Sequence, residues 1–69
     1  MVPVPLVRFA MEEFKFLFDR AHDDVMQVLA MVQWRTQGTD TKNAARAELS
    51  KLARDLGYRR DGDTWSRAA

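Results

Sequence analysis

The sequence predicts a mainly α-helical fold, in which a long helix and a shorter antiparallel helix form a helical hairpin, followed by a small C-terminal β-hairpin, with two copies forming a homodimer. Three observations lead to this prediction. Apolar residues recur with a helical period across residues 6–37, with no Gly or Pro among them. A shorter helical pattern covers residues 41–56. An Asp-Gly pair between two short flanks near the C-terminus is typical of a tight β-turn.

The composition is that of one small globular domain, spanning residues 1–69. Hydrophobic residues make up 46% of the chain and charged residues 30%, which excludes a disordered protein. A core of this size rarely supplies more than about 3–5 kcal/mol without a further constraint. The chain has no Cys and one His, which excludes disulfides, Cys-based zinc sites and multi-His metal sites. Oligomerisation is the remaining source of added stability.

Residues 1–5 are predicted to form an extended arm, because each Pro favours extended geometry in the residue before it. Pro5 suits the first helical position, where a missing N–H costs little. This N-terminus lacks the basic region, apolar run and cleavage site of a signal peptide. Charged residues interrupt every apolar stretch, so we expect a cytoplasmic protein with no membrane-spanning segment.

Residues 6–37 are predicted to form one uninterrupted helix, a rod roughly 45 Å long. At about 100° per residue, its apolar positions fall on one stripe. The rest of the chain is too short to cover such a rod, so a second copy is expected to pack against it. The residues expected in this dimer core are Phe14, Leu17, Phe18, Ala21, Val25, Val28, Leu29 and Val32.

A second, weaker apolar stripe lies on the opposite side of this predicted helix. Phe9 and Phe16 are one heptad apart, and Trp34 falls on the same side near the far end. Two interpretations stay open: the C-terminal half of the chain covers these rings, or at least one ring stays exposed for another protein. Aromatic residues are enriched in the cores of interfaces, so these three are candidates for partner binding.

The long helix is predicted to end at Gly38, because Gly readily takes the left-handed conformation that closes a helix. Asp40 is the expected N-cap of the second helix, at residues 41–56. A connection this short folds the second helix back against the first. The apolar stripe of the second helix consists of Ala45, Leu49, Leu52 and Leu56.

The β-hairpin is predicted over residues 58–66, with Asp61-Gly62 as a two-residue type I′ turn. This turn would place Tyr58 directly opposite Trp65. An aromatic cross-strand pair contributes roughly 0.2–1 kcal/mol, and a lone hairpin is marginal in water. We therefore expect both rings to pack on the helices, with the hairpin as a further candidate anchor for a partner.

The residues do not support an enzyme, a metal site or a bound cofactor. The three glycines are scattered, so there is no Gly-rich phosphate-binding loop. His22 has no Cys partner and no Ser at helical spacing, which argues against nucleophilic catalysis. The spacing of Asp19, Asp23 and Asp24 matches no EF-hand loop.

Two functional classes remain. The favoured one is a homodimeric module that binds another protein and inhibits or modulates it. Its candidate partner-binding residues are Phe9, Phe16, Trp34, Tyr58, Trp65, Arg46 and Arg54. The alternative is a small winged-helix-like DNA-binding regulator. Its candidate contacts are Lys42, Arg46, Arg54, Arg59 and Arg60.

The charge distribution favours the protein-binding module. The net charge is +1, and residues 36–69 carry seven basic and five acidic side chains. A dedicated nucleic-acid binder usually shows a stronger basic excess. The helix that would enter the groove also carries Glu48 and Asp55. In addition, a winged helix needs one more helix than the sequence pattern contains.

The length, the frequent use of Arg, Ala, Asp and Val, the absence of Cys and the long predicted helix resemble small phage-encoded proteins that inhibit a bacterial host factor. Among these, the chain is similar in length and inferred architecture to the anti-quorum-sensing proteins of Mu-like Pseudomonas phages. The resemblance implies a homodimer in the host cytoplasm. It also implies a protein that blocks the DNA-binding domain of a quorum-sensing activator and inhibits the ATPase that assembles type IV pili. It assigns no functional residue.

Overall fold

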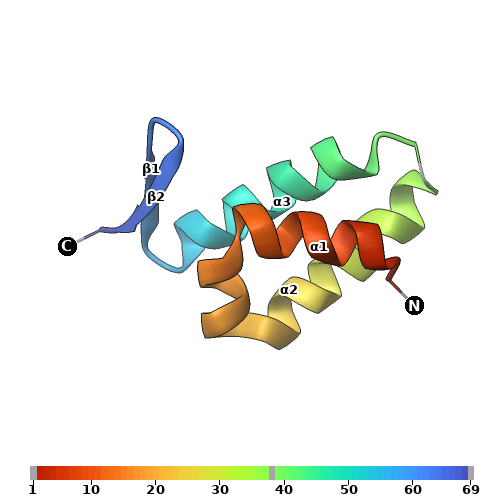
Figure 1. The fold of residues 1–69 in the computed structure, drawn as a ribbon, viewed down its shortest axis with the longest axis horizontal. Coiled ribbons are helices and arrows are strands. Elements are labelled where there is room, and N and C mark those ends of the chain that lie inside the picture. The colour runs from red at the N-terminus through yellow and green to blue at the C-terminus, as the bar shows by residue number, and fades with distance from the viewer. Residues whose placement is uncertain (1, 38, 69) are drawn as a thin grey trace.

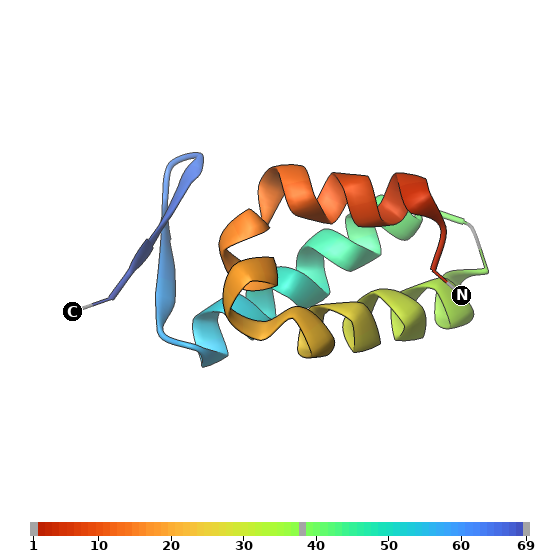
Figure 2. The same ribbon diagram turned by 60° about the horizontal axis from the view of Figure 1, so that its bottom comes forward.

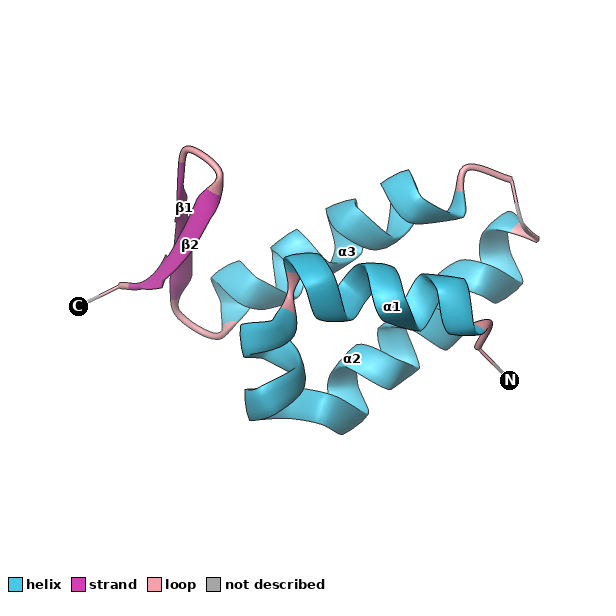
Figure 3. Cartoon of the chain, viewed as in Figure 1, coloured by secondary structure: helices cyan, strands magenta, loops and turns pink. Residues whose placement is uncertain are grey.

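The computed structural model describes residues 2–37 and 39–68, which form three helices followed by a two-stranded antiparallel sheet (Figures 1 and 3). The elements are α1 (Val4–Glu13), α2 (Lys15–Thr36), α3 (Thr41–Asp55), β1 (Tyr58–Asp61) and β2 (Thr64–Arg67). Helix α2 runs in the opposite direction to α1 and α3, and the three helices contact one another (Figure 2). Within the described ranges, no helix is both long and apolar enough to cross a membrane.

The predicted uninterrupted helix over residues 6–37 is wrong, because the chain turns at Phe14. The backbone there leaves the helical region (φ −127°, ψ 36°), and α1 folds back beside α2. The turn costs few hydrogen bonds, since the Phe14 N–H donates to the Ala10 carbonyl at 2.7 Å. The Phe14 carbonyl also accepts from the N–H groups of Leu17 and Phe18. Folding back lets α1 and α3 cover apolar faces that a straight rod would leave exposed.

A second bend lies in α2 at Ala21, whose backbone is not helical (φ −143°, ψ 55°). With both bends, the longest dimension of the molecule is 37 Å, against the roughly 45 Å expected for the straight helix alone. The rod that required a second copy to cover it is therefore absent. The extended arm predicted for residues 1–5 is also shorter than expected, because α1 already begins at Val4 with Pro5 in its first turn.

The connection between α2 and α3 differs from the prediction in its details. Gly38, the predicted helix end, lies outside the described residues. Gln37 takes the left-handed conformation (φ 51°, ψ 42°) immediately after the last residue of α2. Asp40 occupies the predicted N-cap position of α3, but its carboxylate makes no capping bond to the backbone. It instead accepts a hydrogen bond from the Asn43 side chain at 2.7 Å.

Most residues expected in the dimer core lie in the core of a single chain. Of the eight residues expected in the dimer core, Ala21 and Val28 are half-buried, and the other six are buried between the three helices. These six are Phe14, Leu17, Phe18, Val25, Leu29 and Val32. Helix α1 adds Leu6, Phe9 and Ala10, and α3 adds Ala45, Leu49 and Ala53. The apolar stripe therefore faces the chain's own helices.

The β-hairpin forms where it was predicted, but its register differs. Asp61 pairs with Thr64 and Trp65 pairs with Arg60, so the turn is Gly62-Asp63 and not Asp61-Gly62. A type I′ turn would need positive φ at both turn residues. Here Gly62 has positive φ (66°) and Asp63 does not. This arrangement is typical of a type II′ turn. Placing Gly first spares Asp61 the left-handed conformation.

Candidate interaction surface

Four aromatic rings join the hairpin to the helices, and we call them the aromatic cluster: Phe14, Phe16, Tyr58 and Trp65. The ring centres of Phe16 and Tyr58 lie 4.7 Å apart. Trp65 lies 6.0 Å from Phe16 and 6.1 Å from the buried ring of Phe14. Tyr58 and Trp65 are half-buried and sit diagonally on one face of the hairpin. Of the aromatic anchors suggested for a partner, Phe16, Tyr58 and Trp65 therefore pack within the chain.

Phe9, another candidate anchor, is 8% exposed and lies beneath Arg46. The Arg46 guanidinium carbon is 5.2 Å from the centre of the Phe9 ring. The same guanidinium donates two hydrogen bonds to the Glu13 carboxylate, at 3.0 and 3.1 Å, and a third to Asn43 Oδ1 at 3.1 Å. These bonds lower the pKa of Glu13 from its usual 4.5, against a smaller opposing effect of burial. Arg46 thus connects α3 to α1 and is occupied by its own chain.

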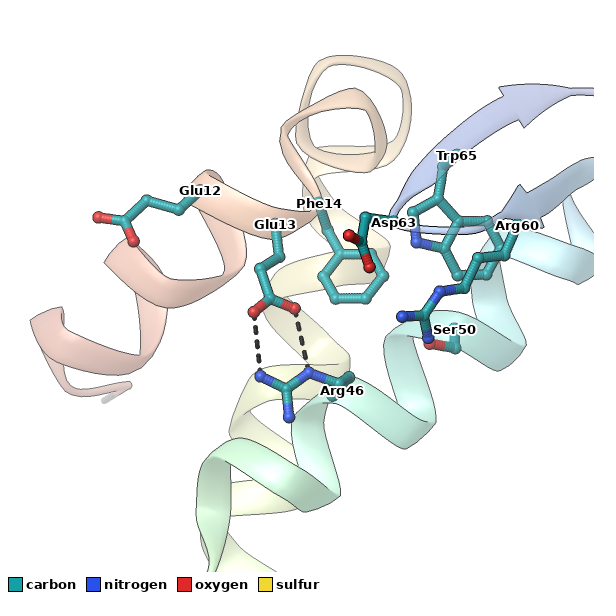
Figure 4. A pocket seen from close by; sticks show the side chains of 8 residues that line it. All are labelled: Glu12, Glu13, Phe14, Arg46, Ser50, Arg60, Asp63 and Trp65. Carbon is teal, nitrogen blue, oxygen red and sulfur yellow. Dashed lines mark hydrogen bonds and ion pairs between the residues drawn. The ribbon is translucent and has the colours of Figure 1, made fainter.

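A polar cavity of about 560 Å³ lies between α1, α3 and the hairpin (Figure 4). Its walls carry three acidic and two basic side chains, with the Phe14 and Trp65 rings as an apolar part. Glu13 and Arg46 point toward each other across one side. Arg60 folds over the hairpin turn, where its Nε donates to the Gly62 carbonyl at 2.8 Å. This mixture of charges selects neither an anion nor a cation, so we assign the cavity no ligand.

The remaining candidates for DNA contact differ in whether they pack against their own chain or are exposed to solvent. Arg54 lies with its guanidinium carbon 5.6 Å from the centre of the Trp65 ring. Lys42 and Arg59 are exposed. Within residues 41–68, seven basic side chains stand against four acidic ones. Helix α3 runs back alongside α2, as in an αα-hairpin, and the steep crossing of a helix-turn-helix is not seen (Figures 1 and 2).

Trp34 is the one aromatic candidate that the fold leaves largely exposed to solvent, with 79% of its surface accessible. It ends a row on the outer face of α2 that we call the α2 stripe: Gln27, Ala30, Met31 and Trp34. Its members follow the i, i+3, i+4, i+7 spacing of one helix face. Gln27 and Ala30 are exposed, and Met31 is 42% exposed. Residues 25–34 contain no charged side chain.

The sequence prediction named Trp34 as a candidate and placed Ala30 and Met31 beside it, but it did not include these two residues or Gln27 among the candidates. The signal was present as the run of ten uncharged residues from Val25 to Trp34, which supplies two helix faces. Val25, Leu29 and Val32 occupy the inner face and are fully buried. Met11 on α1 is 49% exposed, and the charged residues Arg8 and Glu12 lie within three positions of it. The α2 stripe thus differs from an isolated exposed apolar residue, which is common on protein surfaces.

His22 lies at the surface, where its ring meets the Phe18 ring edge-on with centres 5.4 Å apart. Its Nδ1 is 3.4 Å from Asp23 Oδ1. In the described parts of the chain, no group of three or more His, Asp or Glu side chains is placed to hold a metal ion. Comparison of the chain with protein-family models, with curated proteins and with solved structures finds no match.

Proposed function

We propose that this chain is a homodimeric protein-interaction module, and that the α2 stripe is a surface through which it contacts another protein chain. The observation that carries the proposal is the exposure of Trp34 at the end of an uncharged, helically spaced row. Tryptophan is enriched among residues that dominate binding energy, because it buries a large area and loses few rotamers. A bacterial transcription regulator or the pilus ATPase is the class of target that the resemblance described above implies for such a module.

Homodimerisation is proposed because the α2 stripe is exposed, and no longer because a long helix needs a cover. The dimer was expected because a long rod needed a cover, and the fold supplies that cover from α1 and α3. The α2 stripe is a surface that the chain's own helices leave uncovered. The module would act by masking a surface of its target, which requires protein–protein contact and no bound cofactor.

The test places a photoreactive residue at position 34 of the full chain, in living bacterial cells. Met11 is the matched control, because it is an exposed apolar residue on α1, outside the α2 stripe. We expect discrete protein adducts from position 34 and none from position 11. Equal labelling from both positions, or none from either, would contradict the proposal. The adduct mass separates a second copy of this chain from a different protein.

DNA binding is the second candidate, favoured by two observations. The turn at Phe14 supplies a third helix before the hairpin, which the sequence pattern lacked, and residues 41–68 carry a basic excess. Against it, Arg46 is held by Glu13 and α3 lies antiparallel to α2. Retention on duplex DNA that falls steeply with salt, and that is lost in an Arg54→Ala/Arg59→Ala variant, would favour this candidate. We expect no such retention.

A further inference from the structure

We propose that the chain covering the α2 stripe is a second copy of this protein, packed antiparallel about a two-fold axis near Ala30 and Met31. This inference rests on the proposed function, since it names the partner of that same surface. Four observations carry it: the shape on either side of the stripe, its small central residue, the charges at its two ends, and the partners those charges have within one chain.

The α2 stripe is a ridge with a hollow along each side. One hollow, of about 330 Å³, is bordered by Ala30, Gln33 and Trp34. The other, of about 560 Å³, is bordered by Val28 and Met31 of α2 and by Leu52 of α3. Helices pack by seating the ridge of one in the groove of the other. A surface that presents both a ridge and grooves can therefore pack against a copy of itself.

Ala30 lies in the middle of the ridge, where its small side chain allows two helix backbones to approach closely. With the axis between Ala30 and Met31, antiparallel pairing places Gln27 of one copy opposite Trp34 of the other. The large indole then packs against a flexible side chain instead of against a second indole. The stripe is thus self-complementary in size, as an isologous interface must be.

The charges at the two ends of the stripe favour the antiparallel arrangement. Asp24 lies one turn before the stripe, and Arg35 directly follows Trp34. In the antiparallel pair, Arg35 of one copy lies about 3 Å along the axis from Asp24 of the other. Parallel pairing would hold each charge level with its own copy, Asp24 with Asp24 and Arg35 with Arg35, so neither Arg35–Asp24 pair would form. The loss of this attraction disfavours the parallel arrangement.

These charged groups are available for a partner. Asp24 is exposed and takes part in none of the ion pairs found among the described residues. The Arg35 side chain is 55% exposed, and only its Nη2 contacts Glu48, at 3.3 Å. Its other donors have no hydrogen-bond partner among residues 2–37 and 39–68 and can reach a second carboxylate, because a guanidinium carries five N–H groups.

Sedimentation of the full chain over a range of concentrations tests the inference. We expect a monomer–dimer equilibrium that Trp34→Ala weakens at least tenfold and that Met11→Ala leaves unchanged. Asp24→Arg and Arg35→Asp should each weaken the dimer roughly tenfold, because each change makes two attractive pairs repulsive. An equimolar mixture of these two variants should recover wild-type affinity. Circular dichroism confirms folding, and Glu48→Gln controls for the bond that Arg35 makes within its own chain.

Disulfide cross-linking provides a second readout, since the chain has no native Cys. Ala30→Cys, next to the axis, should cross-link rapidly, and Met11→Cys should not. Gln27→Cys separates the two orientations, because antiparallel pairing holds the two thiols about 10 Å apart along the axis and parallel pairing brings them together. A monomer at every concentration, charge variants that associate like wild type, or rapid cross-linking through Gln27→Cys would overturn the inference. If position 34 forms adducts only with a different protein, the proposed function holds and the inference of a second copy is overturned.

Discussion

Arg46 holds Glu13 from 33 positions further along the chain, with Nε and Nη2 donating to the two carboxylate oxygens at 3.1 and 3.0 Å. This pair joins α3 to the last residue of α1, next to the turn at Phe14. A bidentate guanidinium–carboxylate contact fixes orientation as well as distance. The pair therefore helps to hold α1 folded back against the other helices.

The Glu13–Arg46 pair should make stability depend on pH. The Arg46 hydrogen bonds lower the pKa of Glu13 below 4.5, so the contribution is fully present above that pH. It should disappear as pH falls through the lowered pKa of the folded state. Because both side chains are over 40% exposed, we expect Glu13→Gln to cost at most about 1 kcal/mol at pH 7. Urea unfolding measures this cost, and the neighbouring Glu12→Gln is the control. A difference between wild type and Glu13→Gln that persists unchanged at pH 2 would contradict the assignment.

The apolar core should behave as the core of a single chain. Phe14→Ala and Leu17→Ala remove side chains that are 1% and 0% exposed, so each should lower the free energy of unfolding by about 2–5 kcal/mol. The loss should persist at concentrations where the chain is monomeric, because these residues pack against their own helices. Thermal unfolding at several concentrations provides the measurement. Met11→Ala, at a half-exposed position, should change stability little.

The aromatic cluster should couple the hairpin to the helices. Phe16 and Tyr58 have the shortest ring separation in the cluster, 4.7 Å, and lie on different elements. A double-mutant cycle with Phe16→Ala and Tyr58→Ala should give a coupling energy of roughly 0.5–1.5 kcal/mol. Additive effects of the two substitutions would mean that the rings do not support each other. Trp34→Ala, which removes a ring as large but exposed, should leave stability within about 0.5 kcal/mol.

Gln37 should be a position where Gly stabilises the protein. Its left-handed backbone (φ 51°) strains a residue with a Cβ, and Gly relieves that strain. We expect Gln37→Gly to raise the free energy of unfolding by about 0.5–1 kcal/mol, as measured by urea denaturation. Gln33→Gly, one turn earlier inside α2, should have the opposite sign, since Gly costs about 1 kcal/mol within a helix.

The local features of this protein follow from its amino-acid sequence alone. Helical periodicity correctly identified Phe14, Leu17, Val25, Leu29 and Val32 as buried residues. The second helix, predicted over residues 41–56, is present as Thr41–Asp55. Residues with strong turn preferences also located the hairpin. These features depend on neighbours within a few positions, which a sequence pattern records directly.

The exposure of Trp34 could not be predicted in the same way, because it depends on which face the other elements cover. Phe9, Phe16 and Trp34 share one face of the predicted straight helix. In the fold, Phe9 lies beneath Arg46 and Phe16 packs against Tyr58, while Trp34 has no such cover. From the sequence, each of the three rings could be either covered or exposed. Contacts with α3 and the hairpin cover Phe9 and Phe16 and leave Trp34 exposed.

The positions at which the long apolar segment bends depend on contacts between distant parts of the folded chain. Residues 6–37 suit a continuous helix at every local step, and neither Phe14 nor Ala21 is a residue that breaks helices. The bends are favoured because the folded-back chain gains contacts between distant residues, Glu13 with Arg46 and Phe16 with Tyr58. The turn at Phe14 keeps most of its backbone hydrogen bonds, so burial of apolar surface outweighs the few that are lost.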